Sequence, residues 1–316
     1  KYKKAKVSLP GGCAIGSRPV NLHLEALKKM GAEIRIKNGY ILAKSNNGLK
    51  GTLIKFPKIS VGATENVLIA ASYAQGKTKI KNCACEPEVK DLVNFLKKMG
   101  CDIRWTGKRS LEVVGVNKLL PTKYKIIFDR IEAGTYIIAS ALTQGKIKIT
   151  NLDPSIMKSE LSVLTKMGLK ISKLKKMLIV SPSSKIKSIN LKTEPYPGFP
   201  TDLQAQIMVL MTMAKGISTI TENIFENRFM HVSELNRMGA NITVQNNKAK
   251  IYGPQQFNGA ELMATDLRAS VSLVLAGLIG KNKTVVNRIY HLDRGYENLE
   301  LKLSSCGASI KRLRDV

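Results

Sequence analysis

Aromatic residues are scarce in this chain of 316 residues, where Phe, Trp and Tyr together make up 5%. Proteins that read single-stranded RNA stack its bases on aromatic side chains that are interleaved with basic ones. No segment of the sequence shows that pattern, which argues against an RNA-binding module.

Cysteine and histidine are also few. The five cysteines are scattered and odd in number, which excludes a disulfide framework. Cys83 and Cys85 form a Cys-x-Cys pair, but no second Cys or His pair follows at a spacing typical of zinc sites. The three histidines are widely dispersed. The sequence therefore predicts no metal site.

Long apolar segments are missing as well. The longest strongly apolar run covers residues 271–280, which is too short to cross a bilayer. The basic segment 1–6 is followed by no apolar signal segment. We therefore expect a soluble, cytoplasmic protein that does not bind membranes.

Acidic residues are outnumbered, with 23 Asp and Glu against 51 Lys and Arg, and the formal net charge is +28. Nucleic-acid binding is the first functional interpretation of such a charge. The alternative, which we favour, is that lysines coat exposed helix and strand faces. The positive field would then attract phosphorylated substrates.

A short signature, [Met/Cys]-Gly-x-x-Ile, occurs five times, and its glycines are 69, 68, 71 and 68 residues apart. Such a fixed period indicates a repeat architecture. Each copy ends an apolar stripe of helical spacing, such as Leu24, Leu27 and Met30. The glycine is expected in the left-handed conformation that ends a helix, and the Ile is expected to begin a strand.

Each repeat predicts the order strand, helix, strand, helix and two strands. Asn38-Gly39 is a typical hairpin turn between strands 33–37 and 40–43, and Asn246-Asn247 resembles it. Helices over 207–214 and 271–279 are apolar along much of their length, so they should be central and buried.

Five segments give a specific resemblance to a known family. They are LPGGCAIGSRPV (9–20), FPTDLQAQ (199–206), FENRFMH (225–231), MATDLRAS (263–270) and RIYHLDRGYE (288–297). With these segments the chain resembles the UDP-N-acetylglucosamine 1-carboxyvinyltransferases, which are enolpyruvyl transferases of peptidoglycan synthesis. The match extends over nearly the whole chain.

The resemblance implies a fold class: α/β, with two domains that are inside-out α/β barrels of βαβαββ repeats with helices at the centre. The predicted domains are residues 1–129, an incomplete N-terminal domain, and 130–316, the C-terminal domain. Six repeats are expected and five signatures are present, so we expect roughly one and a half repeats to be absent at the N-terminus. In the family that stretch supplies a Lys-Asn pair that contacts phosphoenolpyruvate.

The resemblance also implies the activity: transfer of enolpyruvate from phosphoenolpyruvate to the 3-hydroxyl of UDP-N-acetylglucosamine, with release of phosphate. No cofactor is implied, and we expect a monomer. Two alternatives remain open. One is an inactive fragment, or one that works only with a separate N-terminal piece, and the other is a basic nucleic-acid-binding repeat protein.

Cys13 lies in a loop of Pro and Gly residues before Arg18, where a thiol near arginines should have a lowered pKa. The resemblance implies that Cys13 forms a covalent adduct with phosphoenolpyruvate, assists product release and is alkylated by fosfomycin. A role as acid toward the methylene carbon is one option. Planar arginines suit the phosphate and carboxylate groups of the substrates. By resemblance the arginines around phosphoenolpyruvate are Arg18, Arg228, Arg268 and Arg294.

Asp202 is the candidate base for the sugar 3-hydroxyl, because ionised carboxylates accept protons and nearby positive charge would keep it ionised. Its position after Pro200 and Thr201, before a helix expected over 203–213, also suits an N-cap, and both roles can coexist. Asp266 occupies the equivalent place in the last repeat and resembles a supporting aspartate.

For the sugar nucleotide the resemblance points to two segments of the chain and to Asp202. It also points to Ile224, which would make a backbone contact. Backbone amides at a glycine-containing helix start, as at Gly62, can hold a diphosphate. Asn21 stands where many family members have Asp, and it can both donate and accept hydrogen bonds. The segment residues are Arg18, Pro19, Val20, Asn21 and Leu22, and Lys58, Ile59, Ser60 and Val61.

Overall fold

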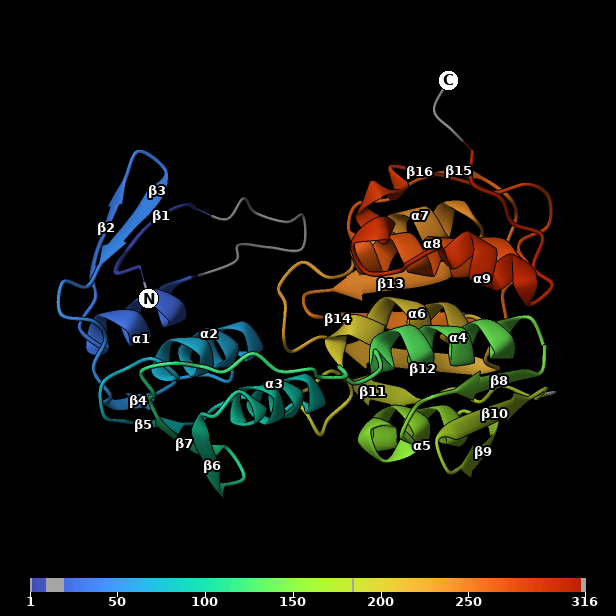
Figure 1. The fold of residues 1–316 in the computed structure, drawn as a ribbon. Coiled ribbons are helices and arrows are strands. Elements are labelled where there is room, and N and C mark those ends of the chain that lie inside the picture. The colour runs from blue at the N-terminus through green and yellow to red at the C-terminus, as the bar shows by residue number, and fades with distance from the viewer. Residues whose placement is uncertain (1, 10–19, 184, 314–316) are drawn as a thin grey trace. The chain divides into compact units, whose positions relative to one another are not determined.

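The computed structural model describes residues 2–9, 20–183 and 185–313 (Figure 1). It divides into two compact units, one ending at Ile127 and the other beginning at Phe128. We call these unit 1 and unit 2, and each is described by itself. Three of the predicted site residues, Cys13, Arg18 and Pro19, lie outside the described residues.

The first sheet of unit 1 is antiparallel and has the order β1-β3-β2. Its hairpin turns at Asn38 and Gly39, both with positive φ (49° and 74°), which confirms the predicted turn. The elements are β1 (Lys4–Ser8), α1 (Asn21–Lys29), β2 (Glu33–Lys37) and β3 (Tyr40–Lys44).

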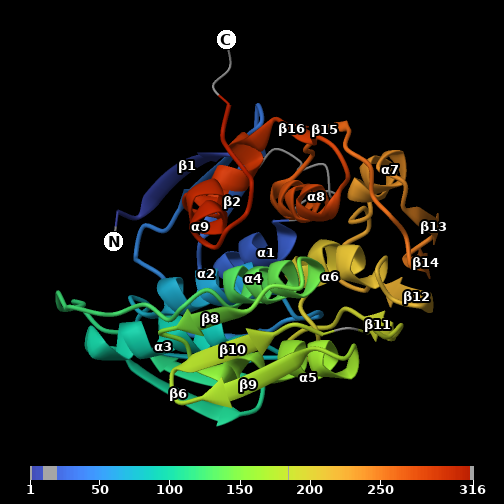
Figure 2. The ribbon, with the colours of Figure 1, turned by 90° about the vertical axis from the view of Figure 1, so that its right-hand side faces the viewer.

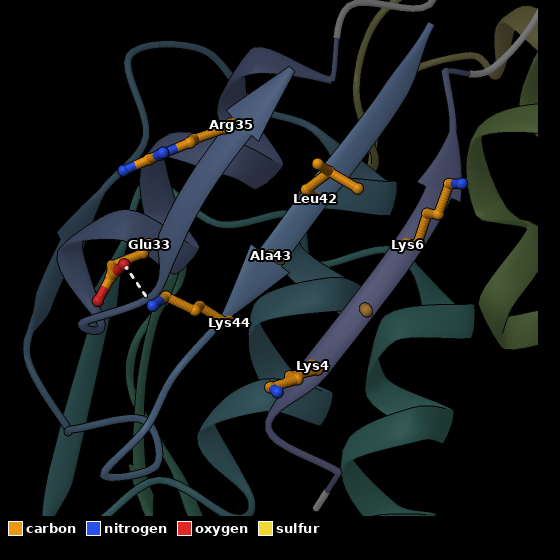
Figure 3. A pocket seen from close by; sticks show the side chains of 8 residues that line it. Lys4, Lys6, Glu33, Arg35, Leu42, Ala43 and Lys44 are labelled. Carbon is orange, nitrogen blue, oxygen red and sulfur yellow. Dashed lines mark ion pairs between the residues drawn. The ribbon is translucent and has the colours of Figure 1, made fainter. Parts of the chain in front are cut away.

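One face of this sheet is strongly basic (Figure 3). Lys4, Lys6 and Arg35 line it around Leu42, and Lys44 pairs with Glu33 at 3.2 Å between Nζ and Oε2. All four basic side chains are exposed. Here the lysines coat an exposed strand face, as the sequence predicted.

The rest of unit 1 contains one complete repeat in the predicted order. Its sheet has the order β4-β5-β7-β6, with β4 parallel to β5 and the other pairs antiparallel. The elements are β4 (Leu53–Lys55), α2 (Val61–Ala71), β5 (Lys77–Lys81), α3 (Pro87–Lys98), β6 (Asp102–Gly107) and β7 (Ser110–Val114).

Unit 2 continues the repeat pattern in its first two sheets. The three-stranded sheet β8-β10-β9 is followed by the four-stranded sheet β11-β12-β14-β13. Their elements are α4 (Arg130–Leu142), β8 (Ile147–Thr150), η1 (Pro154–Met157), α5 (Lys158–Lys166), β9 (Lys170–Leu174) and β10 (Met177–Ser181), then β11 (Asn190–Lys192), η2 (Thr201–Leu203), α6 (Gln204–Met211), β12 (Gly216–Thr221), α7 (His231–Arg237), β13 (Asn241–Gln245) and β14 (Lys248–Gly253).

The last part of unit 2 holds a parallel pair of short strands and the final helices. Its elements are β15 (Glu261–Met263), α8 (Leu267–Ile279), β16 (Val285–Asn287), η3 (Ile289–Arg294) and α9 (Leu299–Ser305).

Helices α4, α6 and α8 pack against one another at the centre of unit 2, and the strands lie outside them (Figure 2). Every residue of α6 is buried, as is most of α8, because these apolar helices have neighbours on all sides. Their side chains form one continuous core with the sheets. This arrangement confirms the predicted inside-out α/β architecture with central helices.

All five signature glycines adopt the predicted left-handed conformation. Glycine adopts a positive φ with little steric strain, because it has no Cβ atom. A glycine therefore ends each helix and lets the chain turn toward the sheet. The residues are Gly31, Gly100, Gly168, Gly239 and Gly307, with φ between 95° and 104°.

Two local predictions were wrong. Ile310 does not begin a strand, because residues 308–313 have no ladder partner in the part of the chain that the structure describes. The helix expected over 203–213 begins at Gln204 and ends at Met211, because the preceding residues form the separate 3-10 turn η2. No helix within the described residues is long and apolar enough to span a bilayer.

Candidate active site

Asp202 lies between two arginines of unit 2. Its Oδ1 is 2.8 Å from Nη2 of Arg228, and its Oδ2 is 2.9 Å from Nη2 of Arg268. Arg228 is buried and Arg268 nearly so, whereas the Asp202 side chain is 39% exposed. The structure therefore brings together three of the predicted site residues, with the carboxylate accessible to a ligand.

The backbone around Asp202 explains why its carboxylate is free for the arginines. Asp202 lies inside η2, which Pro200 precedes as N-cap residue, and the N-cap position of α6 is taken by Leu203. Neither cap residue makes a side-chain hydrogen bond to its helix. The alternative role of Asp202 as an N-cap is therefore wrong, and its oxygens bind guanidinium groups instead.

The charges around Asp202 keep it ionised. Burial alone would raise the pKa of Asp202, but the charges of Arg268 and Arg228 and their hydrogen bonds outweigh burial and lower the pKa to about 2. Burial would lower the pKa of Arg268, yet the net shift is upward because of the charge of Asp202. Asp202 and Arg268 are therefore both charged at neutral pH.

Arg228 belongs to a loop that a second carboxylate organises. Glu222 is buried and accepts hydrogen bonds from the backbone amides of Ile224 and Phe225, at 2.8 and 3.1 Å, and from the hydroxyls of Thr193 and Thr201, both at 2.9 Å. Thr201 Oγ1 in turn accepts from Arg228 Nη1 at 3.1 Å. The loop, the turn before α6 and Arg228 are thus joined in one network.

Asp266 fills the N-cap position of α8. Its Oδ1 accepts hydrogen bonds from the amides of Arg268 and Ala269 at 2.8 and 3.1 Å. The cap fixes the first turn of the helix that carries Arg268. This geometry agrees with a supporting place for Asp266 beside the predicted site.

Two other predicted residues of unit 2 have different surroundings. Arg294 is the last residue of η3 and is exposed, and its side chain makes no hydrogen bond or ion pair with the described residues. Ile224 is 39% exposed, and because its amide already donates to Glu222, its carbonyl oxygen is the backbone group left for a ligand.

The two predicted nucleotide segments of unit 1 meet at the first turns of α1 and α2. These helices pack together, and a methyl group added at Gly62 would lie 3.5 Å from Cε1 of His23. Ser60 is the N-cap residue of α2, and its hydroxyl accepts a hydrogen bond from the Ala63 amide at 3.3 Å.

The other residues of these segments differ in exposure. Val20 is the N-cap residue of α1, and Asn21 is its exposed first residue. Leu22 is buried, Lys58 and Val61 are exposed, and Ile59 is half-buried.

Comparisons with known proteins agree on one family. The family model for EPSP synthase (3-phosphoshikimate 1-carboxyvinyltransferase) matches residues 1–303. The UDP-N-acetylglucosamine 1-carboxyvinyltransferase of Pelagibacter ubique (strain HTCC1062) is 61% identical over 313 residues, which are 99% of this chain and 75% of that protein. The chain belongs to the UDP-N-acetylglucosamine 1-carboxyvinyltransferase family.

Other relatives extend this result. The UDP-N-acetylglucosamine 1-carboxyvinyltransferase of Rickettsia prowazekii (strain Madrid E) is 55% identical over the same shares of the two chains. The enolpyruvyl transferase NikO from Streptomyces tendae has a similar fold, with a TM-score of 0.89 at 24% identity, over 98% of this chain and 74% of that one. An EPSP synthase from Acinetobacter baumannii has a TM-score of 0.74 at 18% identity.

Sequence reasoning missed several residues that surround this candidate site. It assigned no role to Glu222, Thr135, Gln206 or Tyr296, although the last two lie inside the segments that carried the family resemblance. Glu222 accepts from the amide of Ile224, Gln206 donates to the carbonyl of Asp202, and Tyr296 accepts from Arg268. Thr135 reaches the site through Tyr296, which is 161 positions away in the sequence. The signal available in the sequence was Tyr296, which lies close to two arginines in the segment 288–297.

Proposed function

We propose that this chain transfers the enolpyruvyl group of phosphoenolpyruvate to the 3-hydroxyl of UDP-N-acetylglucosamine and releases phosphate. The observation that carries the proposal is the Asp202 carboxylate, held ionised between Arg228 and Arg268. That arrangement supplies a base and two cations for anionic substrates in one place. Peptidoglycan synthesis is the process that uses this reaction.

Asp202 would become a stronger base when substrate binds. With a pKa of about 2 it is ionised but weakly basic. The phosphate and carboxylate of phosphoenolpyruvate would draw the charge of Arg228 and Arg268 toward themselves. Because these charges are what depress the pKa of Asp202, the bound substrate would raise that pKa and favour proton abstraction.

The reaction balances with these groups. Asp202 takes the proton of the sugar 3-hydroxyl while the sugar oxygen bonds to C2 of phosphoenolpyruvate and the methylene C3 gains a proton from the Cys13 thiol, the acid that the resemblance offers. The tetrahedral adduct then returns a proton from C3 to the Cys13 thiolate, the C2–O bond to phosphate breaks, and phosphate leaves. Arginines stabilise the charge on the departing phosphate. By resemblance, Arg18 and Arg294 would join Arg228 and Arg268 in that role.

Cys13 and the segments of unit 1 complete the proposal. By resemblance, Cys13 forms a covalent adduct with phosphoenolpyruvate and is the residue that fosfomycin alkylates. The first turns of α1 and α2, with Asn21, Ser60 and Val61, offer backbone amides for the uridine and diphosphate. We also propose that the protein is cytoplasmic, since its charged substrates do not cross bilayers unaided. We propose in addition that it is a monomer.

The test is the release of phosphate from phosphoenolpyruvate by the purified chain, measured with and without UDP-N-acetylglucosamine. We expect release that depends on the sugar nucleotide, and its loss in Cys13→Ala. Cys306→Ala is the matched control, because Cys306 is an exposed free cysteine. Fosfomycin should add one covalent adduct to the parent and to Cys306→Ala, and none to Cys13→Ala.

Absence of sugar-dependent phosphate release from a folded parent chain would contradict the proposal. So would full activity of Cys13→Ala together with loss of activity in Cys306→Ala, because the thiol chemistry would then lie elsewhere.

A further inference from the structure

We infer that Tyr296 is a positioning residue, which holds the Arg268 guanidinium in the orientation that meets Asp202. Tyr296 is 1% exposed, and its Oη is 3.3 Å from Nη1 of Arg268. The other terminal nitrogen, Nη2, is 2.9 Å from Oδ2 of Asp202. The two contacts hold opposite arms of one planar group, so together they fix its plane.

The protons of this network can be assigned from its geometry. Thr135 Oγ1 is 2.8 Å from the Ile131 carbonyl oxygen, which accepts its single proton. Thr135 must therefore accept in its 2.9 Å contact with Tyr296, so the tyrosine hydroxyl donates there. The lone pairs of Tyr296 then accept from Arg268 Nη1 and from Gln206 Nε2, which lies 3.3 Å from both Tyr296 Oη and Thr135 Oγ1 and shares a proton between them.

Tyr296 is also linked to Asp202 along a second path. Gln206 Nε2 donates to the Asp202 backbone carbonyl at 2.9 Å as well as toward Tyr296. The hydroxyl thus joins α4, through Thr135, to α6, through Gln206, and to Arg268 on α8. These are the three central helices of unit 2. One buried hydroxyl is therefore the common anchor for Asp202 and Arg268.

A phenylalanine at position 296 would keep the ring and its packing but remove this anchor. Arg268 could then turn about its side chain while keeping a single contact to Asp202. The inference rests on the proposed function in one respect, namely that Asp202 and Arg268 take part in the proposed reaction. The geometric effect on Asp202 can be measured without turnover.

The experiment compares Tyr296→Phe with Tyr136→Phe in the full chain. Tyr136 is the neighbour of Thr135 on α4, and its hydroxyl is buried but bonded to no other described residue. Both variants therefore lose one buried phenolic oxygen, but only the first loses contacts to the site. Thr135→Val is a milder variant, which removes the acceptor of the Tyr296 proton and leaves the contact to Arg268.

Two readouts are needed. The first is the pKa of Asp202, followed by carbon-13 NMR of its carboxyl group. The charged groups that face Asp202 are Arg228 and Arg268, with Asp129 adding negative charge near Arg268. Loosening Arg268 in Tyr296→Phe should raise the pKa of Asp202 by about half a unit to one unit.

The second readout is kcat/KM for sugar-dependent phosphate release and its pH profile. We expect Tyr296→Phe to lower kcat/KM about tenfold to a hundredfold, as for the loss of a hydrogen bond to a charged group, and to move the acid limb to higher pH. Tyr136→Phe should leave both readouts at parent values, and Thr135→Val should lie between.

An Asp202 pKa that is the same in Tyr296→Phe as in the parent would overturn the inference, whatever the activity does. A lower melting temperature with an unchanged pKa would mean that Tyr296 is only structural. If the parent chain shows no sugar-dependent phosphate release, the proposed function fails, and the NMR titration alone then decides whether Tyr296 orients Arg268.

Discussion

The central helices of the two units differ in burial although they occupy the same place in the repeat. Every residue of α6 is buried, whereas α2 leaves Val61 and Ile69 exposed at 36% and 55%. In unit 2, α6 packs between α4 and α8; in the described part of unit 1, α2 packs against α1 and α3. The same local pattern thus makes the helix, and its neighbours decide how much of it is buried.

The two units also differ in what they present at their helix starts. Unit 2 gathers Asp202, Arg228 and Arg268 in an ion-paired network supported by buried polar groups. Unit 1 presents Ser60, Gly62 and His23, with backbone amides and the exposed Lys58 beside them. The described helix starts of unit 2 thus carry an ion-paired network, which those of unit 1 lack.

The largest stability effect should come from the central helix of unit 2. Ile207→Ala should lower the free energy of unfolding by about 2–5 kcal/mol, because Ile207 is fully buried and truncation leaves a cavity. Ile69→Ala in α2 should change it by less than about 0.5 kcal/mol, because that side chain is exposed. Urea unfolding of both variants measures the difference. Equal losses of unfolding free energy would show that α6 and α2 do not differ in burial as the structure indicates.

Acid should weaken unit 2 through a buried histidine. Burial lowers the pKa of His231 to about 4, with the charge of Arg228 adding to burial and that of Asp266 opposing it. Between the unfolded pKa of about 6.5 and the folded value, only the unfolded chain binds the proton, so stability falls as pH falls through that window. The total loss should be about 3 kcal/mol.

The matched histidine is His23 in unit 1, whose pKa burial also lowers but which is only half-buried. His231→Gln should remove most of the fall in unfolding free energy between pH 6.5 and pH 4, and His23→Gln should remove less. Denaturant unfolding at several pH values compares the two. An unchanged pH slope in His231→Gln would show that other groups cause the acid sensitivity.

The smallest effects should come from the two helix caps. Asp266→Ala and Ser60→Ala each remove a side chain that accepts amide protons at a helix start, in unit 2 and unit 1 respectively. Each should cost about 1 kcal/mol, with Asp266 at the upper end because its carboxylate makes two such bonds and is buried. Thermal unfolding checks this, and a larger loss in Ser60→Ala would reverse the expected order.

Local patterns predicted much of this fold. The five signature glycines, the Asn38-Gly39 hairpin and the buried helices α6 and α8 all follow from spacing and from residue type. These features depend on backbone conformation and helical periodicity, which neighbouring residues set. Ile310 had the same local signature but forms no strand, because a strand also needs a partner from elsewhere in the chain.

The site shows the same limit. Asp202 and Asp266 both follow a threonine before a helix, and the family resemblance implied a place near the reaction for each. Only Asp266 caps its helix, because the 3-10 turn η2 places Asp202 one residue before the N-cap position of α6, where its oxygens pair with Arg228 and Arg268. Tyr296 could not be assigned from its own segment, since its partners Thr135 and Gln206 come from two other helices.

The most direct test of the central claim is the rate of sugar-dependent phosphate release in Asp202→Asn beside Asp102→Asn. The second variant makes the same change at an exposed ion pair with Arg104 in unit 1. If Asp202 is the base between the two arginines, Asp202→Asn should lower kcat by about 10²–10⁴-fold while Asp102→Asn keeps the parent rate. A folded Asp202→Asn variant with the parent kcat would contradict the account.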